Sequence, residues 1–161
     1  MKTLMLIRHA KTESGNFEQD DFSRVLTEQG KKDAQKISKI LDQKGFYPEK
    51  IFSSPAARTR ETSLIFAKNL SLPEENIVWE DAFYQAYPEV FKELIYSLDN
   101  AINSIALVAH NPGISQLAYQ LLSPTFDIDL VPCGTVIIQL KTPNWTELRS
   151  ANKQLLFSMF P

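Results

Sequence analysis

The chain has 161 residues, of which 43% are hydrophobic and 22% charged, and its formal net charge is −2. That length suits one globular domain with a full core, and the composition is too apolar for a disordered chain. No run of lysine or arginine offers a footprint for nucleic acid, and no stretch reaches the ~20 apolar residues of a membrane span. The single cysteine, Cys133, excludes an intramolecular disulfide, offers no metal-ligand spacing and favours a reducing, cytoplasmic compartment.

The first third of the chain predicts a strand, a long loop and a helix. Residues 3–7 form a continuous apolar run of strand length, typical of a strand that is buried on both faces. The polar segment 11–25 that follows is long enough to be a functional loop. Thr27 is placed to cap a helix, and Gly45 is placed to end it.

The next segment predicts a strand, a helix and a strand. Residues 51–53 form a short second strand. Ser54 is expected to be the N-cap of the second helix and Pro55 its first residue, because serine and proline favour those two positions. That helix is expected to run to about Asn69, before a third strand over residues 77–79.

The rest of the chain predicts two helices and three strands. A helix is expected from Pro88 to Leu98, and residues 105–109 form the most apolar strand pattern. Asn111 and Pro112 repeat the cap and first-residue signals at the start of a helix with a clean apolar stripe. Two strands are expected to close the chain, at residues 134–140 and 154–160.

Strands that alternate with helices predict βαβ units and a mostly parallel sheet. The last two strands have no convincing helix between them, so an antiparallel edge region is expected. The predicted class is therefore an α/β three-layer sandwich with helices on both faces of the sheet. We expect residues 1–161 to form a single domain.

The chain contains only two histidines, and each follows an apolar strand pattern. His9 comes directly after Arg8, and His110 precedes Asn-Pro-Gly. Residues just past the carboxyl ends of parallel strands line the ligand crevice, so both imidazoles are candidates for one site. Arg8 makes that site attractive to anions.

A further cation is expected at the same edge of the sheet. Arg58 falls in the first turn of the second helix, where backbone N–H groups favour anions, and guanidinium groups bind phosphate bidentately. Thr62 lies four residues later on the same helix face, whereas Arg60 lies about 200° around the helix from Arg58. The five glycines form neither a Walker A nor a dinucleotide fingerprint, so side chains and helix N-termini would have to hold a phosphate.

Each of these residues alone also has a structural interpretation. Arg58 could be a solvated surface charge, and His110 could belong to an ordinary strand-to-helix turn. A zinc site is disfavoured, because it needs three or four protein ligands and the chain has no cysteine cluster. Three strand-to-helix junctions that deliver cationic or imidazole groups to one sheet edge favour phosphoryl chemistry instead.

Taken together, these segments resemble the histidine phosphatase superfamily, also called the phosphoglycerate mutase-like family. The resemblance rests on Arg8-His9, on Ser53-Ser54-Pro55-Ala56-Ala57-Arg58 with Thr62, and on Val108-Ala109-His110-Asn111-Pro112-Gly113. Residues similar to the short, SixA-type branch of phosphohistidine phosphatases are Asp21, Arg24, Leu26-Thr27 and Gly30. The chain departs from the pattern at Ala10, where many members carry glycine, and at Val25, where the short branch often has proline.

The resemblance implies a phosphatase that works through a phosphohistidine intermediate. His9 would be the nucleophile, while Arg8, Arg58 and His110 would surround the phosphoryl oxygens. Thr62 is expected among the substrate-binding residues. Neither a cofactor nor a metal is implied.

The general acid is the weakest part of the pattern. Glu80, Asp81 and Glu89 are candidates, but each is in a context where acidic residues are usually solvated. Between Pro73 and Ser104 there is room for no more than one helix, so the cap insertion of larger relatives is expected to be absent. An open site without a strong acid fits phosphohistidine on another protein, such as a histidine-transfer domain.

Two alternatives stay open. One is an enzyme of the same fold that hydrolyses a small phosphate ester. The other is a non-catalytic module that binds phosphate without turnover. The presence of His9, which a pure binder would not need, weighs against the second alternative.

Overall fold

The computed structural model describes residues 1–124, 127 and 129–161. Its strands form one six-stranded sheet in the order β3-β2-β4-β1-β5-β6. The strands are β1 (Lys2–Arg8), β2 (Lys50–Ser53), β3 (Ile77–Trp79), β4 (Ser104–Ala109), β5 (Thr135–Leu140) and β6 (Lys153–Met159). The α-helices are α1 (Glu28–Gln43), α2 (Ala57–Asn69), α3 (Pro88–Tyr96) and α4 (Gly113–Leu122).

The sheet is parallel except near one edge. β1 and β2 both pair with β4 in parallel, and β3 pairs with β2 in parallel. β5 runs antiparallel to β1, and β6 runs antiparallel to β5. The predicted α/β class with an antiparallel edge region is confirmed.

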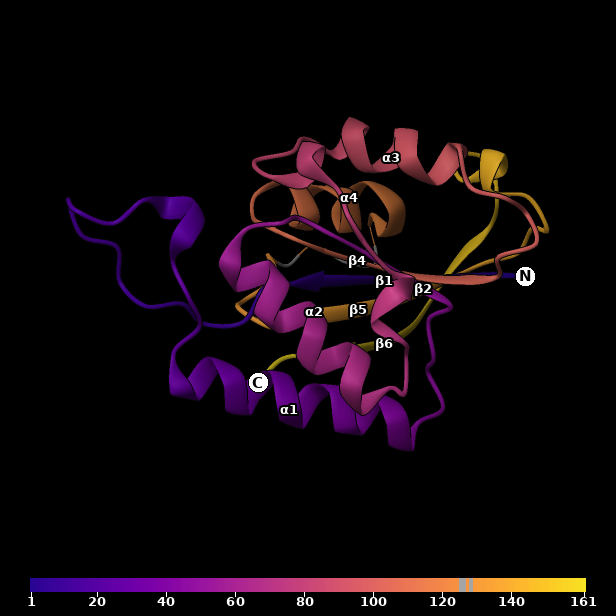
Figure 1. Cartoon of the computed structure of the whole chain (residues 1–161). Helices are drawn as coiled ribbons and strands as arrows, with labels where there is room; N and C mark the ends of the chain where they lie inside the picture. The colour runs from indigo at the N-terminus through magenta and orange to yellow at the C-terminus, as the bar shows by residue number, and fades with distance from the viewer. Residues whose placement is uncertain (125–126, 128) are drawn as a thin grey trace.

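Helices cover both faces of the sheet. Figure 1 shows α1 and α2 on one side of it and α3 and α4 on the other. Leu6 and Leu107 belong to the core under α3 and α4, whereas Ile7 and Val108 belong to the core under α1 and α2. Successive residues of a strand point to opposite faces, so β1 and β4 are apolar at every central position because both faces are covered.

The ends of α1 are those that the sequence predicts. Thr27 is its N-cap, and the Thr27 hydroxyl oxygen accepts a hydrogen bond of 2.9 Å from the backbone N–H of Gly30. Beyond the C-cap, Gly45 has φ +76°, a left-handed conformation that glycine adopts without the steric cost of a Cβ.

The predicted start of α2 is wrong by two residues. The helix begins at Ala57 and not at Pro55, and its N-cap, Ala56, makes no side-chain capping bond. The Ser54 hydroxyl lies 2.8 Å from Nε2 of His110, and its contact with the backbone N–H of Ala56 is only a long one of 3.4 Å. The Ser54 side chain, which was expected to cap the helix, therefore contacts His110 instead.

The start of α4 is also corrected. Pro112 is the N-cap of this helix and not its first residue, and the peptide bond before it is cis. Asn111 does not cap the helix: its side-chain amide donates to the backbone oxygen of Leu130 at 2.9 Å. Its side-chain oxygen accepts from the hydroxyl of Ser115 at 2.5 Å.

The connection from β3 to β4, which is described throughout, contains α3 as its one α-helix, preceded by the short 3-10 turn η3 (Asp81–Phe83). The predicted helix ends at Tyr96, two residues before Leu98. The loop between β1 and α1 projects from the body of the molecule (Figure 1) and contains the 3-10 turn η1 (Asp21–Ser23). Within the described residues, no helix is long and apolar enough to cross a bilayer.

Candidate active site

A cavity of about 530 Å³ opens at the carboxyl ends of β1, β2 and β4. It is lined by Arg8, His9, Thr12, Asp21, Arg24, Arg58, Gln85, Ala86, Tyr87, His110, Asn111 and Pro112. Three guanidinium groups face one carboxylate, so with both histidines neutral the lining has an excess of positive charge. The strand-to-helix junctions after β1, β2 and β4 meet at this cavity, as the sequence predicts.

Strand register brings the two histidines together. Arg8 of β1 is opposite Ala109 of β4, so the next residue of each strand, His9 and His110, lie side by side. Their ring centroids are 5.3 Å apart, and the ring planes are inclined at 55°. Both side chains are buried.

His9 is held in one tautomer by its own turn. Nδ1 lies 2.8 Å from the backbone oxygen of Ala10. Because a carbonyl oxygen can only accept, Nδ1 carries the proton of the neutral ring and Nε2 keeps its lone pair. Burial, helped by the positive charges of Arg58 and Arg8, lowers the pKa of His9 to about 4, and the Ala10 hydrogen bond opposes this shift. The imidazole is therefore neutral at pH 7.

His110 is anchored at one nitrogen and unpartnered at the other. Its Nε2 lies 2.8 Å from the hydroxyl of Ser54 at the end of β2, and its buried Nδ1 has no hydrogen-bond partner. Burial, followed by the charge of Arg58, lowers its pKa to about 3. The ring of Tyr84 packs edge-on against it, with centroids 5.6 Å apart.

The two arginines of the cavity floor are only partly satisfied. Arg8 Nη1 donates to the backbone oxygen of Leu130 at 2.9 Å. Arg58 Nη1 donates to the backbone oxygen of Asp21 at 2.7 Å, and Nη2 donates to Oδ2 of the Asp21 carboxylate at 3.1 Å. In both side chains Nε is buried and has no partner. Each guanidinium is thus held in place with donor capacity left over.

Asp21 organises the cationic groups from the η1 turn. Its Oδ1 accepts two hydrogen bonds from Arg24, at 3.0 and 2.8 Å, and its Oδ2 accepts from Arg58 and, at 2.7 Å, from the hydroxyl of Tyr84. The hydrogen bond from Tyr84, together with those from the two arginines, lowers the pKa of Asp21 to about 2. The carboxylate is therefore ionised at neutral pH and cannot donate a proton.

The connection before α3 closes one side of the cavity with Gln85, Ala86 and Tyr87. It approaches the start of α4 so closely that a Cβ at Gly113 would lie 2.0 Å from the backbone oxygen of Ala86. Any larger residue at Gly113 would push this wall outward. The glycine of the Asn-Pro-Gly sequence thus has a packing role.

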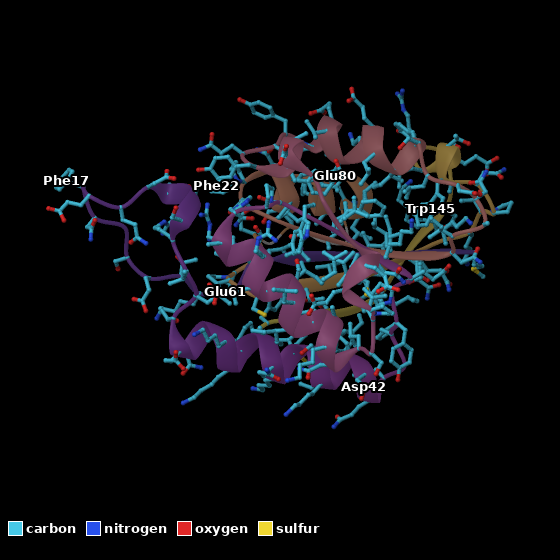
Figure 2. The ribbon with its side chains drawn as sticks, viewed as in Figure 1. Phe17, Phe22, Asp42, Glu61, Glu80 and Trp145 are labelled. Carbon is cyan, nitrogen blue, oxygen red and sulfur yellow. The ribbon has the colours of Figure 1, made fainter. Side chains whose placement is uncertain are left out.

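The three acidic residues proposed as weak general-acid candidates, Glu80, Asp81 and Glu89, are absent from the cavity lining. Figure 2 labels Glu80 on the connection that leaves β3. Its backbone N–H donates to the backbone oxygen of Ser53 at 2.8 Å. Among the described residues that line the cavity, Asp21 alone carries a carboxyl group.

Similarity to known sequences identifies the family of this chain. Residues 4–82 match the model of the histidine phosphatase superfamily, branch 1. A chloroplastic protein of Arabidopsis thaliana, itself uncharacterised, is 30% identical over 155 residues, which are 91% of this chain and 70% of that protein. The chain belongs to the histidine phosphatase superfamily. It is accordingly a phosphatase.

Two solved structures share the fold of this phosphatase. A SixA structure from Agrobacterium tumefaciens superposes with a TM-score of 0.85 at 24% identity, covering 99% of this chain and 98% of that one. The protein histidine phosphatase SixA in complex with tungstate superposes with a TM-score of 0.82 at 17% identity, covering 98% and 96%. At these identities the likeness establishes the phosphoglycerate mutase-like fold of the SixA structures.

Thr62 of this histidine phosphatase lies behind the cavity and not in its lining. It is fully buried, its hydroxyl donates to the backbone oxygen of Arg58 at 2.7 Å, and it accepts from the backbone N–H of Ala10 at 3.1 Å. Arg60 lies elsewhere, stacked 4.2 Å from the ring of Trp79 and exposed, as the helical spacing predicts. Thr62 thus ties the start of α2 to the end of β1.

Sequence reasoning missed Tyr84 and gave Asp21 and Arg24 no role. All three are in loops or at the edge of a 3-10 turn, where no periodic pattern marks them. The charge pattern Asp21-x-x-Arg24 is the one local signal that could have been used, because an i, i+3 pair can bond directly. Within the described residues, no cluster of three or more histidine, cysteine or acidic side chains could hold a metal ion.

Proposed function

We propose that this cavity removes the phosphoryl group from phosphohistidine on a protein, through a phosphorylated His9. The observation that carries the proposal is that three residues lining one cavity each have a buried nitrogen without a hydrogen-bond partner: Arg8 Nε, Arg58 Nε and His110 Nδ1. A buried polar group without a hydrogen bond costs about 1–3 kcal/mol, so three in one place favour an anionic ligand. The tungstate of the similar SixA structure is a tetrahedral oxyanion of the same shape as a phosphoryl group.

In the first step, the lone pair on His9 Nε2 attacks phosphorus while the P–N bond to the substrate imidazole breaks. The substrate ring, protonated on its other nitrogen, leaves as a neutral imidazole. His9 then carries the phosphoryl group on Nε2 and its original proton on Nδ1, so its ring is positively charged. The hydrogen bond from Nδ1 to the oxygen of Ala10 stabilises that charge.

In the second step, water attacks the same phosphorus and the P–N bond to His9 Nε2 breaks. The bonding pair returns to Nε2, the water proton passes to solvent, and inorganic phosphate leaves. In both steps Arg8, Arg58 and His110 donate to the phosphoryl oxygens. Such fixed donors supply most of what phosphoryl transfer requires of a protein.

The choice of substrate follows from the carboxyl groups. An alkoxide leaving group needs a proton from a positioned acid, whereas a protonated imidazole leaves readily from phosphorus. Asp21 is held ionised, and Glu80, Asp81 and Glu89 do not line the cavity. The site therefore favours a P–N bond over an alkyl phosphate ester.

The experiment is a comparison of phosphate donors. A phosphorylated histidine-transfer domain and an aryl phosphate should be hydrolysed with much higher kcat/KM than sugar phosphates or phosphoserine, because general acid catalysis contributes about 100- to 10,000-fold. If an alkyl ester is the best substrate, the enzyme is instead a small-ester phosphatase of the same fold.

Variants separate the roles of the residues. His9→Ala should abolish turnover and the acid-labile phosphoenzyme, whereas Glu80→Gln, Asp81→Asn and Glu89→Gln should each leave phosphohistidine turnover nearly intact. Labelled phosphate retained on the His9→Ala protein would exclude His9 as the nucleophile. A wild type that binds phosphate but never becomes labelled and never turns over would be a binding module.

We also propose a domain organisation for the chain. We treat residues 1–161 as one histidine phosphatase domain without a cap insertion, since a single sheet carries the six strands of the described residues and only η3 and α3 intervene between β3 and β4. A phosphorylated protein is then free to approach the cavity. The cytoplasmic location expected from the sequence stays a prediction.

A further inference from the structure

A second hollow, distinct from the catalytic cavity, lies where α3, α4 and the start of β6 meet. Its volume is about 460 Å³, within the usual range of small-molecule sites. It is lined by Lys92, Tyr96, Gln120, Leu121, Leu148, Arg149 and Lys153. None of these residues lines the catalytic cavity, and none of them is acidic. The hollow therefore gathers three positive charges in a chain whose net charge is −2.

The three cations are poorly neutralised. The guanidinium of Arg149 is exposed and has no hydrogen bond or ion pair within the described part of the chain. Lys153 Nζ donates to the backbone oxygens of Arg149 and Ala151, at 3.1 and 2.9 Å, and not to a carboxylate. Lys92 has a contact of 3.9 Å with Glu89 on the same helix, too long and too exposed to offset its charge fully.

The charge of Lys153 is also partly desolvated. Burial lowers the pKa of this ammonium group, whose described partners are dipoles without net charge. A bound anion would stabilise the charged form of Lys153 and offset the free-energy cost of its desolvation. The geometry thus combines a fixed ammonium group, a free guanidinium and a lysine on the neighbouring helix around one hollow.

The remaining walls are apolar and aromatic. Leu121 and Leu148 are 9% and 1% exposed and form a closed floor, while Tyr96 is 37% exposed and offers part of its ring. Lys92 and Tyr96 are four residues apart in α3 and therefore share one face of that helix. A ligand that suits all of these walls has several negative charges and a flat ring.

We propose that this hollow is a second ligand site, which binds an organic polyphosphate with a flat ring, of the nucleoside di- or triphosphate class. The phosphates lie among Lys92, Arg149 and Lys153, and the ring lies against the exposed part of Tyr96, above the floor that Leu121 and Leu148 form together. The site is separate from the chemistry: α4 begins at the catalytic cavity, and Leu121 is eight residues farther on, about 12 Å along the helix axis.

The test is calorimetric titration of the full chain with ATP, in the absence of divalent metal. The Arg58→Ala variant serves as the background, because it removes a phosphate donor from the catalytic cavity. We expect ATP to bind this background in the micromolar to millimolar range. Adenosine and pyrophosphate should each bind at least tenfold more weakly than ATP, because each lacks half of the proposed contacts.

Second substitutions on that background locate the site. Arg149→Ser and Lys92→Gln should each weaken ATP binding about tenfold, as expected for one charge-assisted contact at a partly exposed site. Lys39→Ser, on the exposed surface of α1, changes net charge equally and should leave the affinity unchanged. Tyr96→Leu should weaken ATP but not pyrophosphate.

Three results would overturn the proposal. One is no ATP binding up to 10 mM, roughly the weakest affinity of interest. Another is binding that is lost in Arg58→Ala but untouched by Arg149→Ser, which would place the nucleotide in the catalytic cavity. The third is equal loss in Arg149→Ser and Lys39→Ser, which would show a general effect of net charge.

Discussion

The Tyr84 hydroxyl donates to Asp21 Oδ2 at 2.7 Å, and the same oxygen accepts a hydrogen bond of 3.1 Å from Arg58 Nη2. Tyr84 also packs the edge of its ring against His110. One side chain from the connection after β3 thus contacts both the anchor of Arg58 and the imidazole of His110. Tyr84 is positioned to orient two of the proposed phosphoryl-binding groups, although it is not itself among the residues that line the cavity.

Removal of this hydroxyl should loosen Arg58. Tyr84→Phe keeps the ring against His110 but removes one hydrogen bond to a carboxylate, an interaction of about 1.5–3 kcal/mol when buried. Because Asp21 is 45% exposed, we expect the lower end of that effect, about a tenfold loss of kcat/KM. Steady-state kinetics with a phosphorylated histidine-transfer domain would measure the loss.

Tyr87→Phe is the matched control for Tyr84→Phe. Tyr87 lines the same cavity but is 74% exposed, and no hydrogen bond of its hydroxyl occurs within the described residues. Its variant should retain nearly full activity. Equal losses in the two variants would show that Tyr84 has no special link to Asp21.

Arg58 and Arg60 form a second matched pair on α2. Arg58 is 5% exposed and lines the cavity, whereas Arg60 is exposed and stacks on Trp79. Arg58→Ala should lower kcat by about 100- to 1,000-fold, the usual cost of one transition-state donor. Arg60→Ala should change kcat less than about threefold, so similar effects at the two positions would argue against the proposed site.

The fold and the positions of His9, His110 and Arg58 were predictable because they depend on local sequence patterns. The apolar runs that end at Arg8 and Ala109 mark strands covered on both faces, and two histidines directly after such runs belong at the carboxyl edge of the sheet. The spacing from Arg58 to Arg60 likewise separates the two side chains by helix geometry alone. These features require no knowledge of long-range contacts.

The parts that sequence reasoning missed all depend on long-range partners. Ser54 has the local character of a helix cap, but its hydroxyl contacts His110, 56 residues away. Tyr84 bonds to Asp21 across 63 residues of sequence. Neither pair has a periodic signature, so local propensity favours the wrong role for Ser54 and no role for Tyr84. Thr62 is buried behind the cavity with the backbone of Arg58 and Ala10 as its partners, two contacts that local spacing does not reveal, and its role in substrate binding stays a prediction.

The two histidines should not titrate near their usual pKa. Burial lowers the pKa of His9 to about 4 and that of His110 to about 3, whereas both have values near 6.5 in the unfolded chain. The unfolded chain therefore binds more protons once the pH falls below about 6.5. The free energy of unfolding should accordingly decrease as the pH falls from about 6.5 towards 3. Above about pH 6.5 the two histidines should not change it.

Imidazole nitrogen chemical shifts measured by NMR would test this directly, and His9→Ala assigns both rings because the chain has only two histidines. Between pH 8 and 5 we expect both rings to stay neutral, with the proton of His9 on Nδ1. Added phosphate should raise the pKa of His110, since a nearby dianion favours the charged ring. A titration midpoint near 6.5 for either ring in the absence of phosphate would contradict the buried geometry.

Thr62 distinguishes positioning from substrate contact. Its buried hydroxyl bridges the backbone oxygen of Arg58 and the backbone N–H of Ala10. Thr62→Val keeps the shape but leaves the Ala10 N–H buried without a partner, which should cost about 1–3 kcal/mol of unfolding free energy. Because Ala10 also holds His9 through its carbonyl oxygen, kcat should fall together with stability.

Thr62→Ser keeps the hydroxyl and removes only a methyl group. It should cost about 1 kcal/mol for the buried methyl and leave kcat close to that of the wild type. Urea unfolding and steady-state kinetics on both variants give the comparison. A residue that contacted the substrate would behave differently: Thr62→Val would raise KM while the unfolding free energy stayed unchanged, and that pattern would restore Thr62 to the substrate-binding set.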